Sequence, residues 1–257
     1  MRAVALGVDV GSTTCKAVAL DAAGRTVLER LEPADPRVEP QVERMLEELR
    51  AVAEPGAPVG ATGYGRKRVR SSRVLTEITC HARGAFAHAG RPGLLVDMGG
   101  QDTKVIRIGV HGEVLDFAMN DKCAAGTGRF LEVILGRLRV PLAEVAGFAR
   151  AADRKVAVSS TCTVFAESEV ISLVAAGEPL SGIVRGLHQA LAARVAALLR
   201  ASADAAGEIW MSGGVAQNAA MVAALEEALG RAVAVLPRPQ LVGAIGAALA
   251  VLPGGHP

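Results

Sequence analysis

The sequence lacks a long hydrophobic run, and this absence bears on where the protein works. Its 257 residues contain no uninterrupted apolar stretch of the roughly eighteen residues or more that a transmembrane helix needs. The N-terminus runs directly into a strand-like segment, without a charged region, apolar core and cleavage site. We therefore expect a cytoplasmic protein that has no membrane partner.

The sequence also has little net charge. A formal charge of +2 is too small to argue for nucleic acid as a partner. The only basic run lies between Arg66 and Arg73, and we expect it to be a solvated face.

Closely spaced cysteine pairs are missing as well. The four cysteines are Cys15, Cys80, Cys123 and Cys162, and no two of them form a C-x-x-C motif. A cytosolic location argues against structural disulfides, and the wide spacings offer none of the paired knuckles of a four-cysteine zinc site. We expect Cys15 and Cys80 to be small buried apolar residues.

Neither common nucleotide fingerprint is present: the sequence has no G-x-x-x-x-G-K-[ST] loop and no G-x-G-x-x-G motif. What it has instead is an internal duplication. The segment LGVDVGSTTCKAVALDAAGRTVL, from Leu6, returns as LLVDMGGQDTKVIRIGVHGEVLD, from Leu94. Pairs at one constant offset include Asp9 with Asp97, Gly11 with Gly99, Lys16 with Lys104 and Gly24 with Gly112. The repeat predicts two related lobes.

Strand and helix patterns alternate along the rest of the chain. Helical periodicity covers Gln41 to Ala53 and Leu180 to Ser202. Short buried strands are predicted at Lys155 to Val158, Glu208 to Met211 and Ala232 to Leu236. This alternation indicates an α/β fold.

The first copy carries a turn suited to an anion. Gly11, Ser12, Thr13 and Thr14 combine small residues with hydroxyl groups, so backbone N–H groups can approach a phosphate while side-chain oxygens donate hydrogen bonds. Lys16 can add a positive charge.

The second copy offers a matching turn. Gly99 and Gly100 supply flexible backbone, Gln101 and Asp102 supply polar side chains, and Lys104 follows. Gln101 and Asp102 are both candidates to orient an attacking water, because phosphoryl transfer depends on positioning. The residues leave open which of the two matters more.

Asp9 and Asp97 close the two buried strands that precede these turns. Carboxylates in this place suit Mg²⁺ held through water, because Mg²⁺ prefers oxygen ligands and keeps much of its hydration shell. A lone Asp before Gly is more often a turn cap. The paired, duplicated context favours the magnesium role.

A third glycine turn lies near the C-terminus. In it Gly213 and Gly214 separate a buried strand from a helix expected to begin near Val215, with Gln217 and Asn218 following. Two glycines permit the close approach of a flat ring such as adenine. Taken alone, the stretch is equally well explained as a tight turn between strand and helix.

Together these three turns resemble the actin-like ATPase superfamily, whose duplicated ribonuclease-H-like lobes hold a nucleotide in the cleft between them. The resemblance implies ATP or ADP as ligand. From the duplication we expect a first lobe of residues 1–90 and a second lobe of residues 91–240. The resemblance implies that the final helix, from Leu241 to Leu252, packs back onto the first lobe, which adds residues 241–257 to it.

A closer resemblance is to the ATP-dependent activators of 2-hydroxyacyl-CoA dehydratases and the related benzoyl-CoA reductase ATPase subunits. It rests on the motifs DVGSTTCK, ATGYGR, CHARGA, DMGGQDTKVI, NDKCAAGTGRFLE, SSTCTVFAESEVISL and SGGVAQN. It implies that Cys123 and Cys162 bind one 4Fe-4S cluster shared across a homodimer, since two chains would supply the four thiolates such a cluster normally takes. Helix patterns at Gly128 to Leu138 and Val164 to Ala175 follow the two cysteines, so both thiolates are expected near positive helix ends. Ser159, Ser160 and Thr161 are expected to cap the second helix.

The resemblance implies an ATPase that passes one low-potential electron to a dehydratase, with a ferredoxin or flavodoxin as its donor. We expect the segment from Gln101 to Cys123 to connect phosphate and cluster. Three rivals stay open: the ATPase subunit of a benzoyl-CoA-type reductase, a small-molecule kinase of the same superfamily, and a nucleotide-responsive regulatory module without turnover. The kinase would leave the cysteine motifs unexplained.

Overall fold

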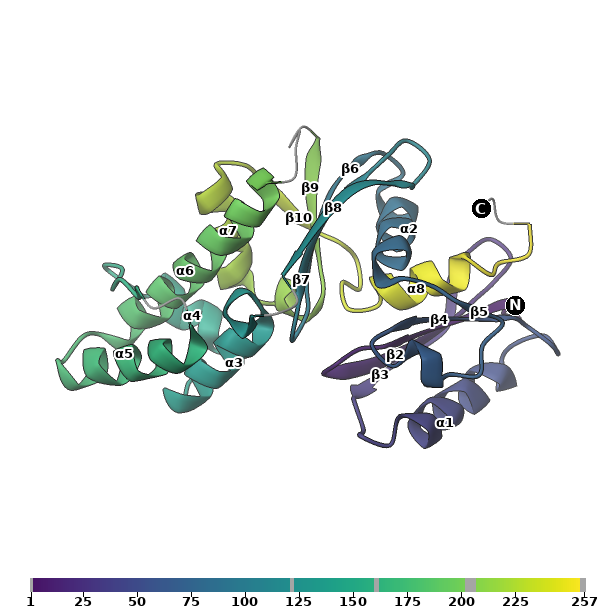
Figure 1. Cartoon of the computed structure of the whole chain (residues 1–257), viewed down its shortest axis with the longest axis horizontal. Coiled ribbons are helices and arrows are strands. Elements are labelled where there is room, and N and C mark those ends of the chain that lie inside the picture. The colour runs from purple at the N-terminus through teal and green to yellow at the C-terminus, as the bar shows by residue number, and fades with distance from the viewer. Residues whose placement is uncertain (1, 121–122, 160–161, 202–206, 255–257) are drawn as a thin grey trace. The chain divides into compact units, whose positions relative to one another are not determined.

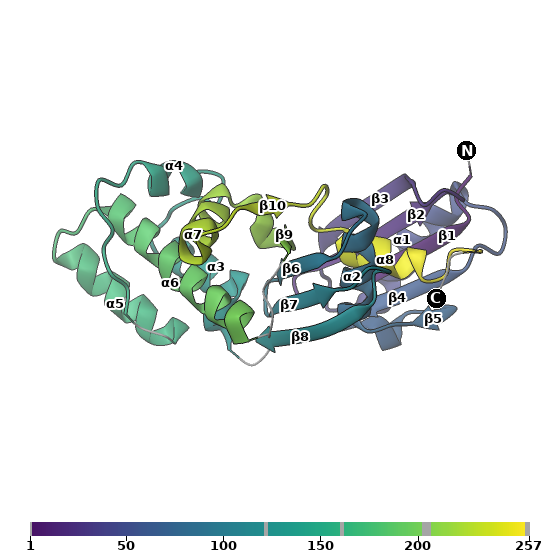
Figure 2. The same ribbon diagram turned by 90° about the horizontal axis from the view of Figure 1, so that it is seen from above.

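The computed structural model describes residues 2–120, 123–159, 162–201 and 207–254, and the chain forms two compact units. Unit 1 contains residues 1–93, 106–116 and 236–257, and unit 2 contains residues 94–105 and 117–235. Figures 1 and 2 show the course of the chain through both. Among the described residues, none of the helices combines the length and apolar character that crossing a bilayer requires.

Unit 1 is built on a five-stranded sheet of order β3-β2-β1-β4-β5. Its strands are β1 (Ala5–Val10), β2 (Thr14–Leu20), β3 (Thr26–Pro33), β4 (Val59–Gly63) and β5 (Arg73–Val74). Its helical elements are α1 (Val38–Ala51), the 3-10 turn η1 (Arg66–Arg68), α2 (Glu77–Ala89) and α8 (Val242–Leu249).

The two faces of this sheet are covered by different helices (Figure 1). Along β2, Cys15, Ala17 and Ala19 pack into the core formed with α1, whereas Val18 and Leu20 pack with α8. Successive side chains of a strand point to opposite faces, so the second half of β2, which is apolar at every position from residue 17 to 20, fits a sheet buried on both sides.

Glycines let α8 approach both the sheet and α2 at backbone distance. A Cβ atom on Gly7 of β1 or Gly60 of β4 would overlap backbone atoms of α8, and one on Gly246 would overlap Cys80 of α2. These small residues thus determine how closely α8 packs against β1, the strand that carries Asp9 near its C-terminal end.

The second sheet has the order β10-β9-β6-β7-β8. Its strands are β6 (Gly93–Met98), β7 (Thr103–Ile108), β8 (Val114–Asn120), β9 (Glu208–Ser212) and β10 (Val233–Val235). The helical elements of unit 2 are η2 (Ala124–Gly126), α3 (Gly128–Arg137), α4 (Val145–Arg150), α5 (Thr163–Ala175), α6 (Leu180–Ala201), η3 (Gly214–Gln217) and α7 (Ala219–Leu229).

One apolar core joins that sheet to the helices of unit 2. Val96 and Met98 of β6 and Val105 of β7 pack with Phe130 of α3 and with side chains of α6 and α7. The helices that share this core all follow the turn between β6 and β7 in the sequence.

The duplication predicted from the sequence is confirmed in the hydrogen bonds. Gly24 donates from its backbone N–H to Asp21 at 2.9 Å, and Gly112 donates to Gly109 at 3.1 Å. These two glycines have φ angles of +75° and +78°, a region that favours glycine. The same turn thus closes the second hairpin of each copy.

Three local predictions were wrong. Lys155 to Val158 is not a strand; its Val156 N–H donates to the Gly182 carbonyl of α6 at 3.0 Å, so the segment lies along a helix and outside the sheet. The helix expected near Val215 begins as the 3-10 turn η3, and α7 starts at Ala219.

The third wrong prediction is the capping role expected for Ser159. Its backbone N–H and hydroxyl both donate to the Glu169 carboxylate of α5 at 2.8 Å, so it contacts the middle of that helix and does not cap its first turn. Ser160 and Thr161, the other two hydroxyl residues of this expectation, lie outside the described residues.

Candidate functional site

The first glycine turn, Gly11 to Thr14, for which the sequence predicts phosphate binding, lies between β1 and β2. The Gly11 N–H donates to the Thr14 carbonyl at 3.1 Å, which closes the turn and leaves Ser12 and Thr13 at its tip. A Cβ atom on Gly11 would lie 3.0 Å from both the Lys16 ammonium and the Thr14 carbonyl, so a side chain there would require these neighbours to shift by a few tenths of an ångström.

The Lys16 ammonium lies 3.2 Å from Asp9, whose side chain is buried at the end of β1. The pair places one cation and one carboxylate beside the turn.

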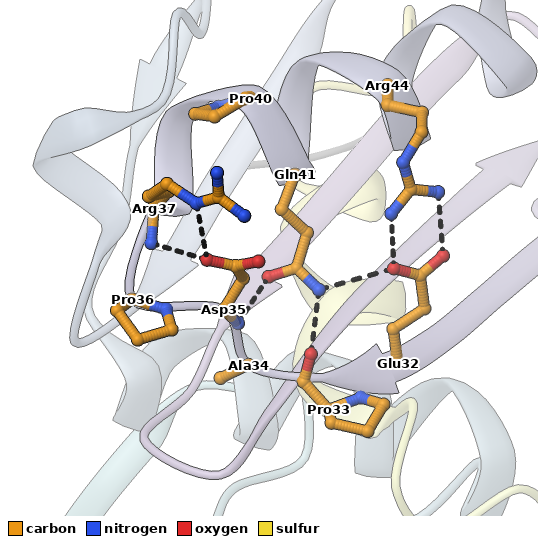
Figure 3. Close-up of a pocket in the computed structure, with 9 residues that line it drawn as sticks. All are labelled: Glu32, Pro33, Ala34, Asp35, Pro36, Arg37, Pro40, Gln41 and Arg44. Atoms are coloured by element: carbon orange, nitrogen blue, oxygen red, sulfur yellow. Dashed lines mark hydrogen bonds and ion pairs between the residues drawn. The ribbon is translucent and has the colours of Figure 1, made fainter.

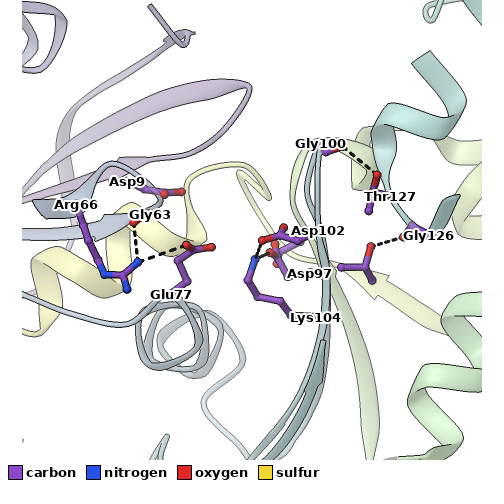
Figure 4. A network of polar contacts seen from close by, with 12 residues as sticks. Asp9, Gly63, Arg66, Glu77, Asp97, Gly100, Asp102, Lys104, Gly126 and Thr127 are labelled. Atoms are coloured by element: carbon purple, nitrogen blue, oxygen red, sulfur yellow. Dashed lines mark hydrogen bonds and ion pairs between the residues drawn. The ribbon is translucent and has the colours of Figure 1, made fainter. Parts of the chain in front are cut away.

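The second phosphate turn, between β6 and β7, repeats this geometry. The Gly99 N–H donates to the Asp102 carbonyl at 2.9 Å, the counterpart of the bond from Gly11. The Lys104 ammonium is buried and lies 2.7 Å from Asp102 and 3.5 Å from Asp97 (Figure 4). Gln101 is exposed at the tip of the turn. The two water-positioning candidates therefore differ: Asp102 is bound to Lys104, and Gln101 faces solvent.

A second pair of equivalent glycines, which the sequence comparison missed, ends the strands beside β1 and β6. Gly63 is the last residue of β4 and has φ +92°, and Gly213 directly follows β9 and has φ +88°. A Cβ atom on Gly63 would overlap the Val10 carbonyl, and one on Gly213 would overlap the Met98 carbonyl. Val10 and Met98 occupy matching places, each directly after the strand aspartate. The sequence signal was the shared Gly after a small hydroxyl residue, Thr62 in one copy and Ser212 in the other.

Ser212 contacts the second aspartate directly. Its hydroxyl donates to Oδ1 of Asp97 at 2.7 Å, and both side chains are buried. Oδ2 of Asp97 lies 3.5 Å from Lys104, so the carboxylate is held from two sides. Ser212 was absent from the residues proposed from sequence.

The surroundings of Asp9 include two further residues that sequence reasoning missed. A Cβ atom on Gly243, in the first turn of α8, would lie 2.9 Å from Nε2 of His81 and 3.1 Å from Oδ2 of Asp9. Gly243 thus keeps the helix start close to the carboxylate. Across the same region Arg66 donates to the Gly63 carbonyl at 2.9 Å and lies 3.8 Å from Glu77 (Figure 4).

The third glycine turn runs from Gly213 into η3. Asn218 ends it as the N-cap of α7, accepting from the Ala220 and Met221 N–H groups at 3.0 and 3.3 Å. The Asn218 amide nitrogen lies 2.9 Å from Nε2 of buried His188. The Asn218 side chain therefore positions the turn and the start of α7.

Asp9 and Asp97 suit a hydrated magnesium ion chemically, since each places a buried carboxylate at a strand end beside a glycine turn. Within the described ranges no set of three or more His, Cys, Asp or Glu side chains is grouped to hold a metal ion. Mg²⁺ held through water needs only one or two protein carboxylates, so the residues present fit that mode.

The cysteines divide as expected. Cys15 and Cys80 are fully buried, and burial is the main cause that raises the pKa of each thiol to about 12, so both stay protonated. Cys123 and Cys162 are exposed. Cys162 is the N-cap residue of α5, and Cys123 directly precedes the short turn η2.

The residues around Cys123 fit an anionic group. Arg194 of α6 donates to the Ala125 carbonyl, its guanidinium lies 5.4 Å from the centre of the Phe130 ring, and it interacts with the charge of Cys123. Burial lowers the pKa of Arg194, and the attraction of Cys123 opposes that shift. Two exposed thiols are half of what a four-iron cluster takes, so this chain fits a cluster only as one of two contributors.

A surface pocket lies elsewhere in unit 1, after β3 (Figure 3). Its polar side chains bind one another: Arg44 donates to both Glu32 oxygens, and the Gln41 amide bonds Glu32, Pro33 and Asp35. None of the site residues predicted from the sequence lines it. The pocket borders the first glycine turn: the Ala34 N–H donates to the Thr13 carbonyl at 3.0 Å, and Pro33 pairs with Thr14 in the sheet.

Comparison with known proteins identifies the family of this chain. The model of the BadF/BadG/BcrA/BcrD ATPase family matches residues 6–251. The chain is 39% identical to the (R)-2-hydroxyglutaryl-CoA dehydratase activating ATPase of Acidaminococcus fermentans over 97% of both chains. It is 41% identical to the activator of lactoyl-CoA dehydratase of Anaerotignum propionicum over 95% of each. It is also 30% identical to a benzoyl-CoA reductase subunit of Thauera aromatica, over 96% of this chain and 92% of that one.

Solved structures agree. The activator of the 2-hydroxyisocaproyl-CoA dehydratase from Clostridium difficile, with bound ADPNP, matches with a TM-score of 0.90 and 36% identity, over 98% of this chain and 95% of that one. Component A of the Acidaminococcus fermentans dehydratase gives 0.89 and 38%, over 98% of both. A ROK family glucokinase from Streptomyces griseus shares only the fold, with a TM-score of 0.54 and 17% identity over 95% of this chain and 97% of that one. The fold is that of the actin-like ATPases, as predicted.

Proposed function

The chain belongs to the BadF/BadG/BcrA/BcrD ATPase family, and we propose that it is an ATP-hydrolysing iron–sulfur activator of a 2-hydroxyacyl-CoA dehydratase. The observation that carries this proposal is the presence of two glycine turns closed by equivalent hydrogen bonds together with two exposed cysteines, Cys123 and Cys162. The kinships to three dehydratase activators support the choice of partner.

In this proposal the two turns bind the phosphates of ATP. The first is Gly11 to Thr14 with Lys16, and the second is Gly99 and Gly100 with Lys104. Asp9 and Asp97 hold hydrated Mg²⁺, whose charge would offset that developing on the phosphate oxygens. Gly213, Gly214 and Gln217 take the adenosine part, with Asn218 fixing their turn. We keep residues 1–90 with 241–257 and residues 91–240 as the proposed functional lobes.

We assign the attacking water to Gln101. Its neutral amide can both donate and accept a hydrogen bond, and it is exposed at the tip of the turn. Asp102 is engaged by Lys104 at 2.7 Å, so its contribution is to hold that cation beside the turn. The products are ADP and phosphate.

The thiolates of Cys123 and Cys162 from each of two copies would hold one 4Fe-4S cluster, making the working form a homodimer. The cluster supplies one-electron chemistry at low potential. Arg194 lies beside the segment of Cys123, and Cys162 stands at the N-terminus of α5, so positive charge is placed where an anionic cluster would lie. A ferredoxin or flavodoxin would load the electron in the cytoplasm, and the dehydratase would receive it.

A second candidate has a specific observation in its favour. The 30% identity to a benzoyl-CoA reductase subunit favours an ATPase that serves a reductase of that type. Such a protein would stay joined to its reductase during purification. The small-molecule kinase has only the shared fold behind it.

The test is anaerobic. The protein, reduced by dithionite, is mixed with 2-hydroxyacyl-CoA dehydratases, and dehydration of the hydroxyacyl-CoA is followed with ATP, with ADP or without nucleotide. We expect turnover only with ATP, and none after Gln101→Ala. Hydrolysis of ATP without activation of any dehydratase, together with copurifying reductase subunits, would favour the second candidate. Phosphorylation of a sugar or acid by iron-free protein would establish the kinase.

A further inference from the structure

The second phosphate turn is hydrogen-bonded to the segment that directly follows Cys123. The Gly128 N–H donates to the Gly99 carbonyl and the Arg129 N–H to the Gly100 carbonyl, both at 2.9 Å. In the other direction, the Thr103 hydroxyl donates to the Gly126 carbonyl at 2.6 Å. This link is much shorter than the chain path from Gln101 to Cys123, which runs out and back along β7 and β8.

Peptide geometry gives this link a direction. In a trans peptide the C=O and the N–H of the next residue point opposite ways. The Gly99 and Gly100 carbonyls both face residues 127–129, so the N–H groups of Gly100 and Gln101 point away from them. An anion bound by those N–H groups polarises the same peptide units and makes both carbonyls better acceptors, because linked hydrogen bonds strengthen one another.

Thr127 lies at the meeting point of the turn and the cysteine segment. Its hydroxyl is within 2.8 Å of the Ala124 carbonyl and 3.0 Å of the Gly100 carbonyl. A hydroxyl has one proton, so it donates to one of these carbonyls at a time. Thr127 is fully buried, Gly100 is partly buried and Ala124 is exposed, so the hydroxyl proton goes to whichever of the two carbonyls is the stronger acceptor.

The cysteine segment is held on its other side by α6. Arg194 donates to the Ala125 carbonyl, and the Asn120 amide donates to the Cys123 carbonyl at 3.0 Å. Residues 123–126 are thus fixed at both ends, and the Ala124 carbonyl between them is the acceptor that competes for the Thr127 proton.

We infer that Thr127 is a positioning residue that couples phosphate binding to Cys123. Phosphate on the second turn strengthens the Gly100 carbonyl as an acceptor, the Thr127 hydroxyl turns to it, and the Ala124 carbonyl loses its side-chain donor. The segment from Cys123 to Gly126 is then less constrained, and the thiol becomes more accessible. The inference rests on the proposed function, since it requires nucleotide at the second turn.

The experiment uses the full chain without cluster, so that its readout is independent of electron transfer. Alkylation of Cys123 and Cys162 by iodoacetamide is followed by peptide mass spectrometry, with and without Mg²⁺ and the non-hydrolysable analogue ADPNP. We expect the analogue to speed alkylation of Cys123 at least about threefold. In Thr127→Val that response is lost, and in Thr127→Ser, which keeps the hydroxyl, it returns. The internal control is Cys162: the ratio of its alkylation rates with and without the analogue stays the same in all three proteins.

Calorimetry of ADPNP binding separates the two claims. Wild-type protein that does not bind the analogue refutes the proposed nucleotide site. Binding without faster alkylation of Cys123 overturns only the coupling, as does a Thr127→Val protein that responds like the wild type or a Thr127→Ser protein that does not respond.

A measurement on the wild type alone decides the case in which Thr127→Val fails to fold. Amide hydrogen exchange at Gly128 and Arg129 should slow on addition of the analogue, because their acceptor carbonyls become stronger. Unchanged exchange at both amides, with the analogue bound, would contradict the inference.

Discussion

The hydroxyl of Ser212 donates a 2.7 Å hydrogen bond to Oδ1 of Asp97, joining the end of β9 to the end of β6. Because the carboxylate is buried, loss of this bond leaves it with one donor fewer and no water to replace it. Ser212→Ala should lower the free energy of unfolding by about 1.5–3 kcal/mol, the range for hydrogen bonds to charged groups. It should also raise the Mg²⁺ concentration needed for half-maximal ATP hydrolysis severalfold.

Thr62→Val is the matched control. Thr62 pairs with Asp9 in register, but its hydroxyl donates to the Leu75 carbonyl at 3.3 Å, a neutral acceptor. Loss of this bond should lower the free energy of unfolding by only about 1 kcal/mol. It should raise the Mg²⁺ concentration needed for half-maximal ATP hydrolysis less than Ser212→Ala does. Equal shifts in the two variants would show that the Ser212 bond has no special bearing on magnesium.

Gly213 should tolerate no side chain. Its φ of +88° disfavours any L-residue, and a Cβ atom would overlap the Met98 carbonyl. Gly90→Ala is the control, since Gly90 has φ +67° with open space around it. Urea unfolding should show a loss of about 1 kcal/mol for Gly90→Ala, and a clearly larger loss for Gly213→Ala because the overlap adds to the φ strain. Similar losses would mean that the strand end moves easily away from Met98.

Protonation of His188 should weaken the fold in mild acid. Burial lowers its pKa in the folded protein below the usual value of 6.5, and the bond to the Val184 carbonyl opposes this only in part. The unfolded chain therefore binds the proton first, so the contribution is complete above about pH 6.5 and is lost as pH falls towards the lower folded pKa.

The measurement is chemical unfolding between pH 7.5 and 5. The free energy of unfolding should fall less with pH in His188→Gln than in the wild type. The pKa of His88 is also lowered by burial, so His88→Gln is measured alongside to separate the two histidines. Parallel curves for wild type and His188→Gln would argue against this role.

Thiol reactivity should divide the cysteines two and two. With the pKa raised to about 12 by burial, Cys15 and Cys80 should resist iodoacetamide at pH 8 in the native protein, whereas exposed Cys123 and Cys162 react. All four should react in urea. Native labelling of Cys80 at a rate near that of Cys123 would mean that α2 opens readily from α8.

The sequence predicted those parts of the fold that depend on local or repeated residue patterns. Gly11 and Gly99 are separated by the same offset as Asp9 and Asp97, and each closes its turn with an equivalent backbone hydrogen bond. Such a turn was predictable because its geometry depends mainly on local residues. The α/β class and the course of α6 and α3 were predictable for the same reason, since helical periodicity reports a buried face.

What could not be predicted depends on residues far apart in sequence. Ser212 meets Asp97 only because β9 lies next to β6 in the sheet, and Gly243 nears Asp9 only because α8 packs on β1. The Lys155 to Val158 segment has a strand pattern but packs along α6, so tertiary contacts override its local preference. Arg194 reaches the cysteine segment from a helix whose sequence reads only as amphipathic.

The central claim is that Cys123 and Cys162 of two copies hold one cluster, and the most direct test is to measure iron and acid-labile sulfide in anaerobically purified protein. Wild-type protein should contain about four of each per dimer, with visible absorption. Cys123→Ala and Cys162→Ala should each lose both, while ATP still binds. Wild-type protein that stays colourless and iron-free after anaerobic reconstitution would contradict the account and leave only its nucleotide site.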